Sequence, residues 1–262
     1  MQSEMTSSRA LLEAEGLTRR FGGLTAVKEV SITLAPGELH AVIGTNGAGK
    51  STLINMLSGE IAPSAGRLRF DGIDATGWSQ PKRARAGIGR SYQRTTIFPQ
   101  FSVIENCRLA AQAALQRPWQ VWQAAQACAR SMAIAHEALE VAGLAVHAAR
   151  AAGSLSHGQK RQLEIAMCLA TAPRVLLLDE PLAGMGPEEG ERMLALLERL
   201  RNEHAILLVE HDMDAVFRVA DRITVMVNGA VIASGAPEAI RNNPDVQLAY
   251  LGDAFSDGAM HA

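Results

Sequence analysis

Glycine, lysine and serine residues fall at the spacing of a phosphate-binding loop between residues 44 and 51. The pattern G-x-x-x-x-G-K-[ST] is matched by Gly44-Thr45-Asn46-Gly47-Ala48-Gly49-Lys50-Ser51. Glycines let several backbone N–H groups converge on phosphate oxygens, and a helix that follows directs its N-terminal dipole at the anion. We expect Lys50 to reach the β- and γ-phosphates of a nucleotide and the Ser51 hydroxyl to bind Mg²⁺. The residues expected to contact the nucleotide here are Gly44, Asn46, Gly47, Ala48, Gly49, Lys50, Ser51 and Thr52.

Two acidic residues, Asp179 and Glu180, follow the apolar run 175–178. Burying a charged group costs free energy, so two carboxylates at the end of a core strand indicate that they bind a cation or take part in a reaction. We expect Asp179 to hold Mg²⁺ through water and Glu180 to act as the general base for the water that attacks the γ-phosphorus. The alternative is that both residues only cap the strand before the turn at Pro181.

His211 follows a second short apolar strand, 205–209, and the acidic residue Glu210. A neutral imidazole beside a γ-phosphate can donate a hydrogen bond and hold the attacking water in line with Glu180. A single histidine at such a position can equally have a purely structural role.

The composition is that of an ordinary globular protein. Hydrophobic residues make up 48% and charged residues 20% of the 262 residues, and the net charge is −2. This charge gives no long-range attraction to nucleic acid, so we expect no nucleic-acid partner. The three cysteines, Cys107, Cys128 and Cys168, are scattered, which favours small core residues in a reducing compartment over a disulfide or zinc site. No secretory signal and no run long enough to span a membrane are found.

The elements that must position these residues follow from hydrophobic patterning. We predict antiparallel strands over 11–34 with a turn at Gly22-Gly23, an alternating strand over 67–70, and a helical subdomain over roughly 90–165, where Ala, Gln and Leu prevail. Strand and helix then alternate, which implies a parallel sheet; the predicted ranges are strand 39–43, helix 51–57, strand 175–178, helix 188–201, strand 205–209, helix 213–219 and strand 223–227. The fold class is therefore α/β, with a parallel-sheet core, an N-terminal antiparallel β subdomain and an inserted α-helical subdomain.

The segment Leu155-Ser156-His157-Gly158-Gln159 resembles the L-S-G-G-Q signature of the ATP-binding subunits of ABC transporters. With the phosphate loop and the two carboxylates, the resemblance covers nearly the whole chain and implies a P-loop ATPase with one such domain over 11–252 and a flexible tail over 253–262. It also implies that Ser156, His157, Gly158 and Gln159 contact ATP bound on an opposite subunit, through the N-terminus of the helix that starts near Lys160. Without the phosphate loop, a simple helix cap would be the better interpretation.

The resemblance implies three further correspondences. Phe21 corresponds to an aromatic residue of the family that stacks on adenine, and His211 corresponds to the family's switch histidine. Gln93 corresponds to a glutamine that contacts Mg²⁺ and relays the nucleotide state to the membrane partner. The sequence departs from the family at His157, which replaces a glycine, and at Gly186, which replaces an aspartate. The second change removes the carboxylate associated in the family with the contact of this loop across the dimer.

Several segments resemble the ATP-binding subunits of branched-chain (hydrophobic) amino-acid uptake systems. They are Phe21-Gly22-Gly23-Leu24, Ala183-Gly184-Met185, Glu210-His211-Asp212-Met213, Asn242-Asn243-Pro244-Asp245 and Ala249-Tyr250-Leu251-Gly252. The implied function is ATP-driven import with ATP and Mg²⁺, at the cytoplasmic face of the inner membrane. The implied partners are membrane-spanning permeases, a second ATP-binding subunit that makes a heterodimer, and indirectly a solute-binding protein. One alternative is a soluble ABC-type ATPase that acts on nucleic acid or ribosomes, but such proteins usually carry coiled-coil insertions or two nucleotide domains. The other alternative is a P-loop kinase, which would leave the signature segment unexplained.

Overall fold

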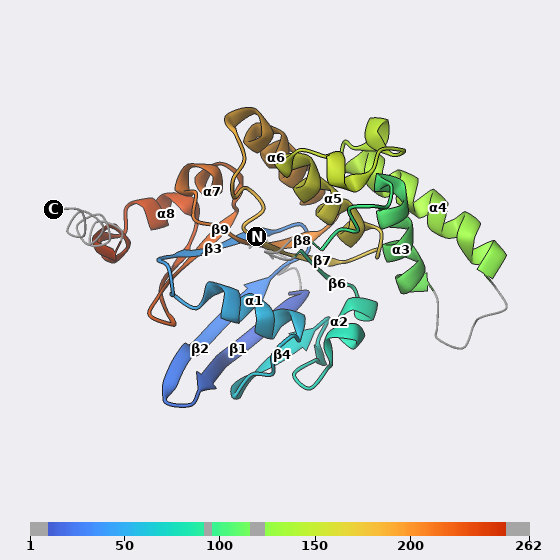
Figure 1. The fold of residues 1–262 in the computed structure, drawn as a ribbon. Helices are drawn as coiled ribbons and strands as arrows, with labels where there is room; N and C mark the ends of the chain where they lie inside the picture. The colour runs from blue at the N-terminus through green and yellow to red at the C-terminus, as the bar shows by residue number, and fades with distance from the viewer. Residues whose placement is uncertain (1–9, 92–95, 116–123, 250–262) are drawn as a thin grey trace, which may run out of the picture. The chain divides into compact units, whose positions relative to one another are not determined.

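The computed structural model describes residues 10–91, 96–115 and 124–249 (Figure 1). The chain divides into two compact units, one of Met1–Gln80 with Arg201–Ala262 and one of Pro81–Leu200. The two units are described in turn.

The first unit contains an antiparallel sheet built from the N-terminal part of the chain. Its strands are β1 (Leu12–Phe21), β2 (Leu24–Leu34), β4 (Ala65–Phe70) and β5 (Ile73–Asp74), in the order β2-β1-β4-β5. β1 and β2 form a hairpin in which Phe21 pairs with Leu24, so the predicted turn at Gly22-Gly23 is confirmed. Gly22 has a φ of 57°, a conformation that glycine adopts without strain.

The first unit also contains the parallel strands that carry the phosphate-loop segment. β3 (Leu39–Gly44) is paired in parallel with β8 (Ala205–Val209) and with β9 (Arg222–Val227), and β10 (Ala230–Gly235) pairs antiparallel with β9. Every residue of β3 and β8 is buried, as expected for parallel strands that are covered on both faces.

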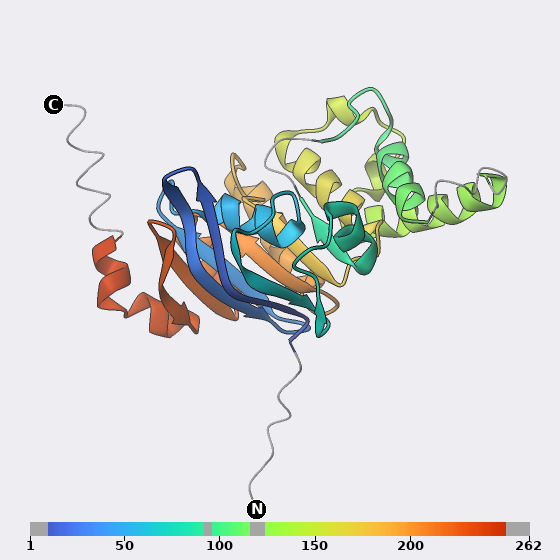
Figure 2. The same cartoon turned by 90° about the horizontal axis from the view of Figure 1, so that it is seen from below.

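The labelled helices of this unit are α1 (Lys50–Ser58), α7 (Met213–Val219) and α8 (Pro237–Arg241), and residues 244–249 are also helical. α1 contacts β1 and β2 as well as β3 and β8, and Figure 1 shows it between the two sheets, which Figure 2 shows from below. α1 therefore joins the two sheets of the first unit and fixes the loop that precedes it.

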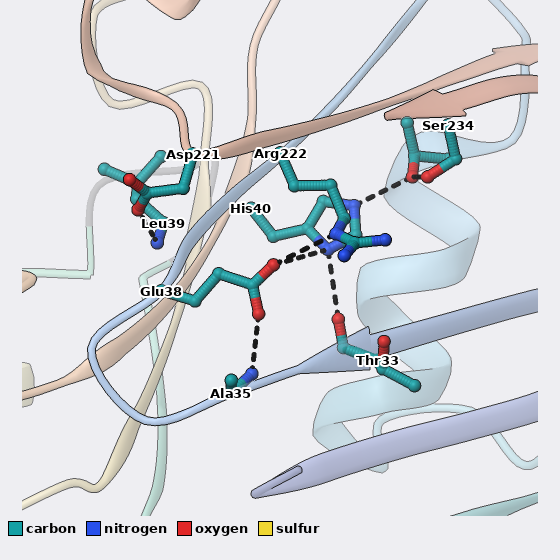
Figure 3. Close-up of polar contacts among 9 residues, drawn as sticks. Thr33, Ala35, Glu38, Leu39, His40, Asp221, Arg222 and Ser234 are labelled. Atoms are coloured by element: carbon teal, nitrogen blue, oxygen red, sulfur yellow. Dashed lines mark hydrogen bonds and ion pairs between the residues drawn. The ribbon is translucent and has the colours of Figure 1, made fainter. Parts of the chain in front are cut away.

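A buried histidine connects four strands of the first unit. The carbonyl of Thr33 accepts a hydrogen bond from His40 Nδ1 at 3.1 Å, so His40 Nε2 is the acceptor of the 2.8 Å bond with Thr224 Oγ1 (Figure 3). Thr224 Oγ1 also lies 2.8 Å from Ser234 Oγ. Burial lowers the pKa of His40. The hydrogen bond to Thr33 and the charge of Glu38 act in the opposite direction, but their effects on the pKa are smaller. The neutral imidazole thus links β2, β3, β9 and β10.

The second unit pairs two parallel strands, β6 (Ile88–Arg90) and β7 (Val175–Asp179), with a set of helices. The helices are α2 (Gln80–Ala86), α3 (Val103–Leu115), α4 (Ala124–Val141), α5 (His157–Leu169) and α6 (Pro187–Leu200), with 3-10 turns at Ala145–His147 and Ala152–Ser154. α3, α4 and α5 contact one another around a core in which alanine is common; its alanines are Ala111, Ala135, Ala138, Ala142, Ala152, Ala166 and Ala170. Small side chains let helix backbones approach closely.

The predicted α/β architecture is confirmed, and most predicted elements lie within two residues of the observed ones. The analysis of the sequence missed the short elements β5, β6, β10, α2 and α8. Within the described ranges, the structure contains no helix that is both long enough and apolar enough to cross a membrane.

Candidate functional site

The phosphate-loop segment connects the end of β3 to the start of α1, as predicted. A Cβ atom at Gly44 would lie 2.1 Å from the carbonyl oxygen of Met226, and one at Gly49, which has a φ of 97°, would lie 2.3 Å from that of Ala26. Both positions therefore require glycine because neighbouring backbones pack directly against them. A Cβ at Gly47 (φ 78°) would meet nothing within 4 Å, so the middle of the loop is open.

Lys50 is the first residue of α1, and its side chain folds back over the loop. Its ammonium group donates hydrogen bonds to the carbonyls of Gly44, at 2.6 Å, and Thr45, at 3.0 Å, and the residue is 7% exposed. The cation is thus held directly beside the loop backbone. Ser51 is exposed and Thr52 half-buried, so both hydroxyl-bearing residues lie at the accessible start of α1.

His211 lies at the same edge of the parallel strands as the phosphate loop. Val42 pairs with Val209, and the N–H of Glu210 donates to the carbonyl of Val42 at 3.3 Å, so β3 and β8 end side by side. The His211 side chain is 59% exposed, with Nδ1 3.8 Å from Oε2 of the fully buried Glu210. Asp212 caps α7 by accepting a hydrogen bond from the N–H of Ala215 at 3.1 Å, which fixes the backbone after the histidine.

Phe21 also belongs to the first unit, at the end of β1. Its ring is 46% exposed, and the guanidinium carbon of Arg19 lies 4.6 Å from the ring centroid. One face of the ring is therefore covered by a cation, which the sequence did not reveal.

The two carboxylates lie in the second unit at the end of β7. Asp179 is 2% exposed, its N–H donates to Ser91 Oγ at 3.2 Å, and its Oδ2 lies 3.9 Å from a guanidinium nitrogen of Arg90. Glu180 is half-buried and has a φ of 50°, a left-handed conformation that is uncommon for a residue other than glycine. Strained backbone of this kind is concentrated at functional sites. Arg90, on β6, is a neighbour of Asp179 that was not identified from the sequence.

The signature segment forms the start of α5, also in the second unit. Ser156 is the N-cap and forms a capping box with Gln159: its Oγ accepts from the Gln159 N–H at 3.2 Å, and its own N–H donates to Gln159 Oε1 at 3.0 Å. His157 is exposed and Gly158 buried. The N–H groups of the first turn therefore sit in an ordered helix start.

Gln93 lies outside the described residues. Cys107 and Cys168 are buried, as expected for core residues, and burial raises the pKa of each thiol to about 12. Within the described ranges, no group of three or more histidine, cysteine, aspartate or glutamate residues is arranged to hold a metal ion.

Comparison with known proteins agrees with these features. The model of the family described as "ABC transporter" matches residues 27–183, and a model described as "Branched-chain amino acid ATP-binding cassette transporter" matches residues 230–256. The chain therefore belongs to the ABC transporter family, in which it is an ATP-binding, ATP-hydrolysing component.

Two relatives are similar along their whole length. The high-affinity branched-chain amino acid transport ATP-binding protein BraF of Pseudomonas aeruginosa is 42% identical over 254 residues, which is 94% of this chain and 100% of BraF. The corresponding protein LivG of Escherichia coli K12 is 42% identical over 256 residues, again 94% of this chain and 100% of LivG.

Solved structures give the same fold. A nucleotide-free ATP-binding cassette from an ABC transporter has a TM-score of 0.83 and 30% identity, covering 92% of this chain and 98% of that chain. The ADP conformation of another such cassette has a TM-score of 0.80 and 28% identity, covering 93% of this chain and 99% of that chain.

Proposed function

We propose that this chain is the ATP-hydrolysing subunit of an ABC importer that takes up branched-chain amino acids or a related small solute. The observation that carries the proposal is the 42% identity with BraF, which extends over 94% of this chain and includes the phosphate loop. The ATP-hydrolysing subunit of such an importer does not contact the transported solute, so the proposed class of solute rests on this similarity. The chain acts as one nucleotide-binding domain over 11–252, with its helical part near 90–165 and a tail over 253–262.

The phosphate loop supports ATP as the ligand. Gly44 and Gly49 are closed in by backbone carbonyls, whereas the space at Gly47 is open, which leaves room for a phosphate to approach the loop backbone. Lys50 already lies beside the loop, where it donates to two carbonyls. In the proposed complex its ammonium group donates to the β- and γ-phosphates instead, and Phe21 stacks on the adenine.

Hydrolysis is assigned to Glu180. Its carboxylate accepts a proton from the water that attacks the γ-phosphorus, and the bond from the γ-phosphorus to the β–γ bridging oxygen breaks, which gives ADP and phosphate. His211 donates a hydrogen bond that orients this water. The hydroxyl of Ser51, the carboxylate of Asp179 and the amide of Gln93 are oxygen donors that suit Mg²⁺, which would neutralise phosphate charge when bound. The exposed serine and the buried aspartate fit such an ion in their chemistry.

An exposed aromatic pair supports docking to a membrane-spanning permease. Phe98 and Phe101 stack with ring centroids 5.5 Å apart, and they are 50% and 47% exposed. The fully buried side chain of Asn106 holds their loop, since its Oδ1 accepts from the Phe98 N–H at 2.7 Å and its Nδ2 donates to the carbonyls of Phe98, at 3.1 Å, and Ser102, at 2.9 Å. A rigid, apolar feature of this kind suits a partner surface.

The start of α5 supports an ATP-dependent dimer. Ser156 and the N–H groups near Gly158 provide an anion site for ATP bound to an opposite subunit, which we propose is a second, different ATP-binding subunit. ATP favours the closed dimer and hydrolysis reopens it, so the permeases alternate between two states. In this assembly the chain is peripheral, at the cytoplasmic face of the inner membrane, and a solute-binding protein acts indirectly on the other side.

The test is affinity purification of the tagged Glu180→Gln chain from detergent-solubilised membranes in the presence of ATP. Loss of the base preserves the ATP-bound assembly, so permeases and a second ATP-binding subunit should be recovered. The double variant Phe98→Ala/Phe101→Ala should lose the permeases, whereas Val146→Ala, which alters a side chain in the same unit that is 86% exposed, should retain them. Recovery of only ribosomes, nucleic acid or soluble proteins would refute the importer assignment.

A further inference from the structure

An acidic side chain of the same chain lies on the start of the signature helix α5. Ser156 Oγ donates a hydrogen bond to Glu189 Oε1 at 2.7 Å. A Cβ atom at Gly158 would lie 2.6 Å from Glu189 Cδ and 2.8 and 2.9 Å from its two carboxylate oxygens. The carboxylate therefore rests directly against the first turn of α5.

The position of this carboxylate follows from the charge properties of helix ends. Glu189 belongs to the first turn of α6, and its side chain reaches the first turn of α5. Both helix N-termini carry partial positive charge, which stabilises an anion placed beside them. The neighbouring Glu188 differs: its side chain is 87% exposed and pairs with Arg192 at 3.4 Å within its own helix. Only the second of the two consecutive acids is thus directed at the signature.

A second contact ties the signature to the segment that leads from Glu180 to α6. His157 Nε2 donates a hydrogen bond to the carbonyl of Ala183 at 3.0 Å. A Cβ atom at Gly184, which has a φ of 73°, would lie 3.3 Å from this nitrogen. The histidine that replaces the usual signature glycine therefore anchors this segment beside α5, which keeps Glu189 within reach of Ser156.

We propose that Glu189 is an autoinhibitory residue whose carboxylate occupies the signature's anion site until a phosphate of the opposite subunit's ATP displaces it. The inference rests on the proposed function, because it needs the signature to receive that phosphate. A carboxylate and a phosphate repel each other and compete for Ser156 and the same helix end, so dimer closure requires Glu189 to turn away. Its half-buried, flexible side chain can do so without backbone movement. The contact raises the ATP concentration at which the dimer closes.

The test compares Glu189→Ala and Glu189→Gln with the matched control Glu188→Gln, all in the Glu180→Gln background and each mixed with the second ATP-binding subunit in the absence of permeases. Analytical ultracentrifugation gives the ATP concentration at half-maximal dimer. We expect Glu189→Ala to lower this concentration about tenfold, equivalent to about 1.4 kcal/mol. Glu189→Gln should have a smaller effect in the same direction, because its amide oxygen still accepts from Ser156 without the charge. Glu188→Gln should stay within about twofold of the parent.

The outcomes separate the inference from the proposed function. If the parent dimerises with ATP but neither Glu189 variant lowers the midpoint, or either raises it, Glu189 is not an inhibitor and only the inference fails. If no variant dimerises at millimolar ATP although thermal unfolding shows that all are folded, the proposed dimer fails and the inference with it.

Discussion

Replacing His40 with leucine tests the buried network that joins four strands of the first unit. The change replaces the imidazole with an apolar side chain of similar size and so removes the bonds to the Thr33 carbonyl and to Thr224 Oγ1. Each buried hydrogen bond contributes about 1 kcal/mol, so we expect a loss of about 2 kcal/mol. For a chain of this size, that corresponds to a fall in Tm of roughly 4–8 °C at pH 7.5.

The same variant should change how stability depends on pH. Burial lowers the pKa of His40 in the folded state, whereas in the unfolded state it returns to the ordinary value. As pH falls below about 6.5, His40 therefore takes up a proton in the unfolded chain before it does so in the folded protein. The free energy of unfolding is at its full value above that pH, and it decreases as pH falls through the pKa that His40 has in the folded protein. The Tm difference between wild type and His40→Leu should therefore shrink between pH 7.5 and pH 5.

Differential scanning calorimetry at several pH values measures both effects, because titration of the other histidines is common to the two proteins. Ser234→Ala, which removes only the outer bond to Thr224, serves as the milder control and should lower Tm by less than half as much. A Tm for His40→Leu within 1 °C of wild type at pH 7.5, or a difference that stays constant down to pH 5, would refute the assigned role of the network.

Further predictions concern the catalytic residue, the loop glycines and the cysteines. Glu180→Gln should slow phosphate release from ATP by about 10²–10⁴-fold while a fluorescent ATP analogue still binds, and an unchanged rate would exclude a general-base role. Gly49→Ala should abolish binding of the analogue because its Cβ meets a backbone carbonyl of β2, whereas Gly77→Ala, with nothing within 4 Å, should bind normally. With their pKa raised to about 12, the thiols of Cys107 and Cys168 should resist a thiol reagent at pH 8 until the protein is unfolded; rapid labelling of either in the native protein, followed by mass spectrometry, would contradict their burial.

The sequence predicted the long elements well because their hydrophobic patterns are self-contained. Uninterrupted apolar residues specify β7 and β8. The short strand β6 has only three residues, one of them a glycine, and it is stabilised by pairing with β7. β10 likewise depends on its antiparallel partner β9. Such elements are defined by tertiary pairing and leave little local signal.

The candidate site was predictable where function depends on a contiguous motif and hidden where it depends on distant neighbours. The phosphate loop and the Asp179-Glu180 pair could be identified from spacing and strand position. The contacts of Arg90 with Asp179 and of Glu189 with Ser156 join residues that are far apart in sequence and on different elements. Only the folded backbone brings these side chains together.

The close approach of Glu189 to Gly158 links two positions in the evolution of this chain. A methyl group at 158 would lie 2.6 Å from the Glu189 carboxyl carbon, so a larger residue there forces the flexible Glu189 side chain to turn away from the start of α5. A lineage that replaces this glycine therefore loses the contact between Glu189 and Ser156 even if it keeps the acid. In homologous sequences, an acid at 189 can make this contact only where glycine is retained at 158.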